Sequence, residues 1–234
     1  MAHPDADRQS ILSCQRCGGC CRSNPPALHL QDRPLYTDSV LRRGDLITFR
    51  KGEKVYDNVQ DRIASLDQEM VRIRSLPQSR ACIFYDHGQR ACRIYARRPL
   101  ECRAFACWEP EGLIHIYDQG RVRRADLISE HSALAQVIAE HERLCPWSRI
   151  MELVALVAQD PDCFQAGELA DMVHVDQGMR QGLRDRAGAT ERELEFILGR
   201  SLASVLPNLG LKVIRTGSGV RLQPCPAPTG QPTG

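Results

Sequence analysis

Cys14-Gln15-Arg16-Cys17-Gly18-Gly19-Cys20-Cys21 is the stretch that decides how this chain folds. It places four thiols within eight residues, in two successive Cys-x2-Cys steps that let several sulfurs converge on one point. Gly18 and Gly19 lack Cβ and permit a positive φ, so the backbone can curl around an ion and direct N–H groups at sulfur. Packing does not account for such a run, and we interpret it as half of a metal-binding site.

A second set of cysteines lies downstream and comprises Cys82, Cys92, Cys102 and Cys107, while Cys145 makes a ninth. Thiolates are soft ligands that select zinc, copper(I) or iron–sulfur clusters over magnesium or calcium. The Cys-x2-Cys-x2-Cys run resembles the cluster-binding run of bacterial ferredoxins, whereas structural zinc usually takes two separated Cys-x2-Cys pairs. We therefore expect an iron–sulfur cluster, of the 4Fe–4S type, or zinc, and both cofactors stay open.

Adjacent side chains on an extended backbone point to opposite sides. On that basis Cys20 and Cys21 are not expected to bind the same ion. Either they serve two neighbouring sites, or one is a ligand and the other packs. Eight or nine thiols suffice for two sites of four ligands each.

Arginines and aromatic residues accompany the second cysteine set. Four thiolates around a divalent ion leave net negative charge, which is costly to bury without compensation. We expect the guanidinium groups of Arg97, Arg98 and Arg103 to donate N–H groups to sulfur, and Arg90 and Arg93 to form a solvated face. Trp108 and Trp147 each follow a cysteine closely and are expected to shield the site from water. His131 and His141 share a predicted helix face with Cys145, and we interpret His141 as a core residue rather than a ligand.

Composition bounds the remaining function classes. The chain has 234 residues and a net charge of +2, which gives no support to nucleic-acid or charged-membrane binding. Its first residues lack the pattern of a signal peptide, and eleven cysteines without an export signal are more typical of metal ligands in a reducing cytoplasm than of disulfides. No nucleotide or S-adenosylmethionine fingerprint is present, so whether the protein is an enzyme is left open, as is an unknown protein partner.

The predicted fold class is α+β, with short strands framing the cysteine site and helices covering it. We expect a cysteine-cluster metal-binding domain at 1–147, a helical appendage ending in a hairpin at 148–223, and a disordered tail at 224–234. Periodicity and turn signals predict the following elements: a helix at 33–43, a strand at 45–50, a hairpin at 112–123, a helix at 126–145 over the site, a helix after Pro146, helices at 167–188 and 190–206, and a hairpin at 211–222. Residues 58–76 fit a helix or a strand.

The two cysteine sets together resemble the YkgJ-type cysteine-cluster family. The motif that carries this resemblance is Cys14-x2-Cys17-x2-Cys20-Cys21, then Cys82, then Cys92-x-Ile-Tyr-x-x-Arg-Pro-x-x-Cys102-Arg-x-Phe-x-Cys107. The resemblance covers residues 14–107, extending toward 145. It implies a zinc- or iron-chelating domain whose metal site is formed by these eight cysteines. Flagellin lysine methylases carry a similar domain, which implies that a redox or protein-modification role is open. The alternative is a structural zinc module without catalysis, whose segment 148–223 meets a partner.

Overall fold

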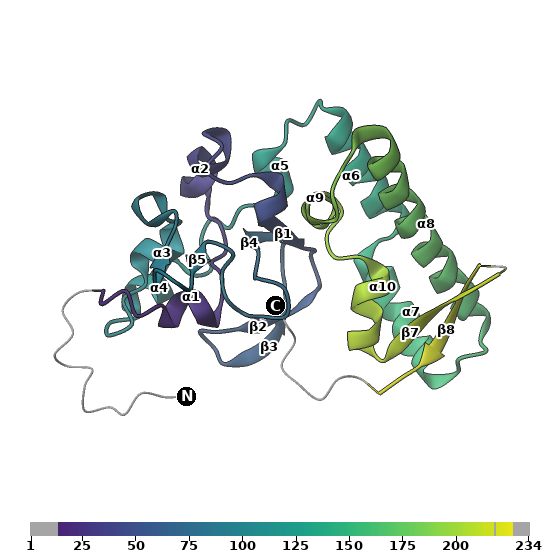
Figure 1. Cartoon of the computed structure of the whole chain (residues 1–234). Coiled ribbons are helices and arrows are strands. Elements are labelled where there is room, and N and C mark those ends of the chain that lie inside the picture. Colours follow the sequence, from purple (N-terminus) through teal and green to yellow (C-terminus); the bar gives the residue numbers. More distant parts are fainter. Residues whose placement is uncertain (1–13, 218, 227–234) are drawn as a thin grey trace.

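The computed structural model describes residues 14–217 and 219–226 and has the mixed α and β composition that was predicted (Figure 1). Its strands form two-stranded antiparallel pairs, and its helices lie on both sides of them. Most of the tail predicted to be disordered lies outside the described ranges, whereas Pro224, its first residue, ends the last strand. The proposed division of the chain after residue 147 stays a prediction.

Two antiparallel strand pairs occupy the middle of the molecule. β1 (Leu46–Phe49) pairs with β4 (Met70–Ile73), and β2 (Lys54–Asp57) pairs with β3 (Arg62–Ser65). The predicted strand at 45–50 is confirmed, and the ambiguous stretch 58–76 holds strands β3 and β4. β1 and β4 are almost fully buried, which explains why β4 lacks a clean polar–apolar alternation.

The cysteine-bearing elements lie together at one side of these strands (Figure 1). They are short, as expected where loops supply ligands. Their bounds are α1 (Gly19–Ser23), β5 (Tyr85–Asp86), β6 (Ala91–Cys92), α3 (Leu100–Ala104) and α4 (Glu111–Ile116), with a 3-10 turn at Tyr95–Arg97.

The hairpin predicted for 112–123 is wrong, because its first half is helix α4. The carbonyl of Pro110 accepts hydrogen bonds from Leu113 and Ile114, and Glu111 places a negative charge in the first turn. The apolar residues of this stretch alternate with polar ones only briefly. The helix start signal at Pro110 and Glu111 outweighed that alternation.

The helix predicted for 126–145 begins later than expected. A short helix α5 (Arg124–Leu127) precedes it, and the main helix α6 runs over Ala133–Leu144. Ser132 caps α6, since its hydroxyl accepts a hydrogen bond from the Ala135 amide at 3.1 Å. His131 therefore precedes the helix, and its side chain is 88% exposed rather than part of an inward face.

Four helices and a hairpin complete the chain. The helix after Pro146 and the hairpin at 211–222 are confirmed, as is the capping box of Thr190 and Glu193. The predicted helix 190–206 divides at Gly199, whose φ of +75° interrupts the helical backbone. The elements are α7 (Trp147–Gln159), α8 (Phe164–Ala187), α9 (Glu191–Ile197), α10 (Leu202–Val205), β7 (Leu211–Thr216) and β8 (Gly219–Pro224).

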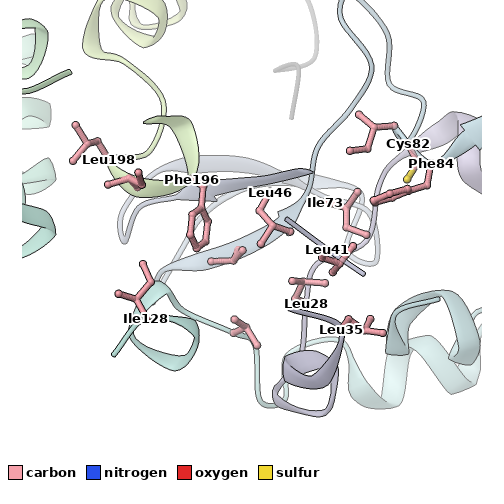
Figure 2. Packing of buried hydrophobic residues seen from close by; sticks show 14 residues of the cluster. Leu28, Leu35, Leu41, Leu46, Ile73, Cys82, Phe84, Ile128, Phe196 and Leu198 are labelled. Atoms are coloured by element: carbon pink, nitrogen blue, oxygen red, sulfur yellow. The ribbon is translucent and has the colours of Figure 1, made fainter. Parts of the chain in front are cut away.

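Two large apolar clusters form the core. The first gathers Leu28, Leu46, Val71 and the buried thiol of Cys82, and helix α9 adds Phe196 to it (Figure 2). This cluster includes α2 (Arg33–Thr37), through Leu35. The second cluster joins α7, α8, α10 and the β7–β8 hairpin. Helix α9 thus belongs in sequence to the predicted appendage but packs against β1 of the cysteine-bearing part.

Candidate metal centre

The N-terminal cysteine run has left-handed backbone at Arg16 and Gly18 and leads into α1. The amide of Arg16 donates to the sulfur of Cys14 at 3.4 Å, and the amide of Gly19 donates to the sulfur of Cys17 at 3.5 Å. Each bond joins a cysteine to the amide two residues later; Gly18 and Gly19 were predicted to allow this at Cys17, and at Cys14 a positive φ of Arg16 accompanies it. Such N–H groups favour the thiolate form and are a common device for tuning metal–sulfur sites.

Gly18 has a structural role that no other residue type fills. Its φ is +73°, and a Cβ on it would lie 2.2 Å from the phenolic oxygen of Tyr85. Tyr85 is buried and pairs across β5 and β6 with Cys92. The glycine therefore lets the first cysteine run pack directly against the strand pair that carries a cysteine of the second set.

Cys20 and Cys21 differ from the expectation. They lie in helix α1 rather than on extended backbone, and their sulfurs are 3.9 Å apart. Four sulfurs at about 2.3 Å from one tetrahedral zinc ion are separated by roughly 3.8 Å. The premise that these two side chains point to opposite sides is wrong, and their sulfurs are close enough to serve either one ion or two ions that lie side by side.

The second cysteine set is joined to the first through the backbone. The amide of Cys82 donates to the carbonyl of Cys21 at 2.7 Å, although sixty residues separate the two in sequence. The amide of Phe84 donates a hydrogen bond to the sulfur of Cys82, and the amide of Ile94 donates one to the sulfur of Cys92. Both bonds favour the thiolate form and lower the pKa of the cysteine. Both donors are again the amide two residues after the cysteine, so the same local geometry recurs in both sets.

Burial disfavours ionisation of the least exposed thiols of the second cysteine set. It raises the pKa of Cys82 to about 11 and raises that of Cys102 well above its ordinary value, with the charges of neighbouring thiols adding to the effect. Cys20 is the exception, since a hydrogen bond from the Cys21 thiol lowers its pKa to about 6, and the same bond raises the pKa of Cys21. A bound cation would stabilise every one of these thiolates and reverse the burial effect.

Electrostatic interactions link the thiols into two overlapping sets that share Cys20. After burial, the causes that raise the pKa of Cys107 are Cys17, Cys20 and Cys14. The neighbouring thiols that act on Cys102 are Cys82, Cys20 and Cys92, and those that act on Cys21 are Cys20, Cys102 and Cys92. Cys20 acts on both groups. The eight cysteines that the motif predicted are therefore brought into one region.

The three arginines predicted to face the sulfurs behave differently. The charge of Arg98 lowers the pKa of Cys20 and Cys92, and its side chain is fixed by the Cys102 carbonyl at 3.2 Å and by the ring of Tyr95. Arg97 instead pairs with Asp38 at 2.5 Å, and Arg103 lies 3.8 Å from Asp32. A contact of Arg97 or Arg103 with sulfur stays a prediction.

Arg93, which was expected to form only a solvated face, has a partner in the protein. Its guanidinium donates to the Ile83 carbonyl at 2.5 Å and lies over the ring of Phe84. Its charge also favours the thiolates of Cys82 and Cys92. Although the residue is exposed, it contributes positive charge to the centre.

Cys145 is placed away from the other predicted ligands. It is fully buried in the second core cluster, and its thiol donates to the Met172 carbonyl at 3.5 Å. It lies between α6 and α7, which Figure 1 shows on the side of the molecule opposite α1 and α3. Trp147 packs in the same cluster, beneath Arg50, so it does not shield the eight cysteines. His141, interpreted as a core residue, is buried and bonds Asp176 at 2.9 Å.

A polar network that the sequence did not reveal positions helix α3. Glu101 accepts a hydrogen bond from the Ala27 amide at 2.9 Å and lies 3.3 Å from His29. Asp32 accepts from the Leu100 amide at 2.8 Å, which satisfies a free N–H at the start of α3. These bonds fix the helix that carries Cys102. The one signal in the sequence is that Glu101 directly precedes this cysteine.

The candidate ligands of the two cysteine sets are thiols, which are the ligands that soft metals prefer. All cysteines among the described residues are free thiols. Within that same part of the chain, no three His, Cys, Asp or Glu side chains are already arranged to hold an ion. The kind, number and proximity of the ligands fit zinc or iron, and the final ligand geometry would form as the metal binds.

Comparison with known proteins agrees with the motif. No curated protein and no solved structure gives a significant match. Across the described residues, no helix combines the length and apolar character needed to cross a membrane. The model of one family covers residues 13–126, from the first cysteine run past Cys107. That segment matches the CxxCxxCC family, which is described as a "putative zinc- or iron-chelating domain". This is the cysteine-cluster family that the sequence motif indicated, and zinc or iron is the metal chemistry that it indicated.

Proposed function

We propose that the eight cysteines hold metal in two adjacent groups of four thiols. The outer group is Cys14, Cys17, Cys20 and Cys107, and the inner group is Cys21, Cys82, Cys92 and Cys102. The observation that carries this proposal is the meeting of the two cysteine segments, joined by the Cys82–Cys21 backbone bond and by the 3.9 Å contact between Cys20 and Cys21. These two neighbouring sulfurs would form the junction between the groups.

An iron–sulfur cluster is the first candidate occupant. The Cys-x2-Cys-x2-Cys run supports it, as do the backbone amides directed at four of the sulfurs. The buried Cys82 and the partly buried Cys102 would give a cluster low-polarity surroundings, which shift its reduction potential. In this form the protein would serve electron transfer or a protein-modification reaction, with a 4Fe–4S cluster as the redox group.

Zinc is the second candidate, and a separate observation supports it. The 3.9 Å contact between the sulfurs of Cys20 and Cys21 would bring two zinc ions side by side, one in each group of four thiols. Eight thiols would then hold two zinc ions. In that case the metal would fix the cysteine segments 14–23 and 82–107, and the protein would act as an interaction module rather than a redox protein.

Metal analysis of protein purified without oxygen separates the two candidates. A brown protein with broad visible absorption, iron and acid-labile sulfide supports the cluster, and colourless protein with about two zinc ions per chain supports the zinc form. Cys107→Ser should reduce metal content from the outer group and Cys82→Ser from the inner group. Cys163→Ser, a half-buried thiol in the second core cluster, is the matched control and should leave metal content unchanged. Protein that contains neither zinc nor iron after expression with both metals supplied would refute the proposal.

A further inference from the structure

A pocket of about 360 Å³ lies beside the cysteine region and is not used by the proposed metal centre. It is bounded by the β2–β3 hairpin, the segment that follows α1, and the chain after α4. Its volume falls in the range of sites that hold small molecules. Arg72 of β4, Glu101 of α3 and Tyr117 contribute polar groups to its walls.

Arg72 is the most unusual of these groups. It is 5% exposed, and burial lowers its pKa to about 10. Its guanidinium bonds the neutral side chain of Asn24 and lies 5.5 Å from the centre of the Phe49 ring. The carboxylate of Glu101 acts on it electrostatically but is itself bonded to Ala27 and His29.

The other buried arginines are paired differently. Each of them forms an ion pair with a carboxylate, and the pairs are Arg50 with Glu142, Arg124 with Glu69 and Arg180 with Asp176. Buried charges are normally paired in this way because desolvating an unpaired ion is costly. Arg72 therefore presents a desolvated positive charge to the pocket. Among the described side chains, its hydrogen-bond partner is the amide of Asn24 rather than a carboxylate. A planar guanidinium in that state suits an oxyanion.

Two further groups make the same wall suited to an anion. Arg121 lies over the Tyr117 ring at 4.5 Å and donates to the Tyr117 carbonyl at 2.8 Å, and it reaches Asp118 at 3.3 Å. Burial raises the pKa of Tyr117 to about 12, so its hydroxyl remains a hydrogen-bond donor at neutral pH. Arg72, Arg121 and Tyr117 thus offer positive charge and a neutral donor. The other charged residues that line the pocket, apart from Glu101, are Asp57, Arg62, Asp67 and Asp118.

The pocket is also connected to the cysteine centre. The charge of Arg72 acts on the thiol of Cys82, and Glu101 is the residue before Cys102. A molecule bound at Arg72 would therefore lie next to the inner thiol group. The pocket is in the half of the chain that carries the cysteines, and α7, α8 and the β7–β8 hairpin contribute none of its lining residues.

We propose that this pocket binds a small polar molecule through a carboxylate or phosphate group, which Arg72 holds beside the inner cysteines. The proposal goes beyond metal chelation, because it adds a ligand site with its own residues. It holds for either occupant of the cysteine centre.

Isothermal titration of the purified full-length protein with inorganic phosphate and with succinate tests this site. We expect saturable binding of at least one probe, and the probe that binds identifies the oxyanion as phosphate or carboxylate. Arg72→Gln should weaken that binding by about tenfold or more, as expected for loss of a charged hydrogen-bond donor. Arg143→Gln removes the same charge from an exposed site on α6 and should leave the affinity unchanged.

A second variant keeps the test decisive if burial of Arg72 makes Arg72→Gln fold poorly. Tyr117→Phe retains the ring under Arg121 and removes only the hydroxyl, and it should weaken binding by roughly threefold to tenfold. Absence of saturable binding of both probes to the wild-type protein would overturn the proposal, as would unchanged affinity in a folded Arg72→Gln or in Tyr117→Phe. Loss of metal in Arg72→Gln with anion affinity retained would instead assign Arg72 to charge balance of the thiolates. Metal content of the wild-type protein is measured separately, so failure of the metal proposal leaves this titration interpretable.

Discussion

Replacing Gly18 by alanine should weaken metal binding, while the same change at Gly19 should not. At Gly18 an alanine must adopt a φ near +73°, and its Cβ would meet the Tyr85 hydroxyl at 2.2 Å. Left-handed backbone costs a non-glycine residue about 1–2 kcal/mol, and moving the buried Tyr85 adds to this. At Gly19 the nearest atom to a new Cβ is the Cys17 sulfur at 3.6 Å, an ordinary contact, and φ is not positive.

The strain at residue 18 should appear mainly as lost metal affinity. In the metal-free protein the turn can relax, whereas metal binding requires Cys17 and Cys20 to converge and so fixes the backbone between them. A penalty of about 2 kcal/mol corresponds to roughly 30-fold weaker binding. Competition with a chromophoric chelator measures this difference for zinc or ferrous iron. Equal affinities of the Gly18→Ala and Gly19→Ala variants would refute the reasoning, and Tyr85→Ala in the Gly18→Ala background should recover only the part due to the clash.

Three further predictions concern stability. Phe196→Ala should destabilise the protein by about 3–5 kcal/mol in chemical denaturation, because it leaves a cavity between α9 and β1, whereas Phe164→Ala, at a side chain 90% exposed, should have little effect. Burial lowers the pKa of His141 below its unfolded value of 6.5, and the side chain also faces Asp176, Arg50 and Glu142. As the pH falls, the unfolded state therefore takes up a proton before the folded state does. The contribution of His141 to the free energy of unfolding should be complete above about pH 6.5 and decrease as the pH decreases. Thermal melts from about pH 8 to pH 5 should show this loss in wild-type protein and in the exposed-site control His131→Gln, and a shallower loss in His141→Gln. Metal removal should raise amide hydrogen exchange in 14–23 and 82–107 but not in α8, and uniform exchange before and after chelation would contradict a folding role for the metal.

The sequence was sufficient to predict the metal chemistry because candidate ligands are encoded by residue type and local spacing. Eight thiols in a specific motif identify the metal chemistry before any packing is known, and the structure brings those eight together. Cys145 shows where this reasoning fails. A cysteine at helical spacing from a histidine looks the same in sequence whether it faces a metal or, as here, packs under α8 against the Met172 carbonyl.

The errors in secondary structure have a common cause. Apolar spacing suggested a strand at 112–117 and a long helix from 126, and in both places a capping signal decided the outcome. Pro110 and Glu111 start α4, and Ser132 starts α6. The buried network around Glu101 could not be predicted, because its partners His29 and Ala27 lie some seventy residues earlier in the chain.

The structure also limits how much of the fold depends on the metal. The spacing of the cysteines, taken alone, would require the metal to close a loop of some sixty residues between Cys21 and Cys82, a closure that costs roughly 4 kcal/mol in its length-dependent part. However, the Leu28 amide donates to the Val71 carbonyl at 2.9 Å, and the Ile73 amide donates to the Pro26 carbonyl at 3.0 Å.

These bonds, together with the apolar cluster around Leu28 and Phe196, already hold the two ends of the loop together a few residues from the cysteines. The metal then has only the short segments beyond them to order. Because α9 packs on β1, the central strands are also stabilised from the C-terminal side. We therefore expect metal loss to unfold the cysteine segments locally, rather than the whole of 14–145, and to leave β1, β4 and α9 as a folded unit.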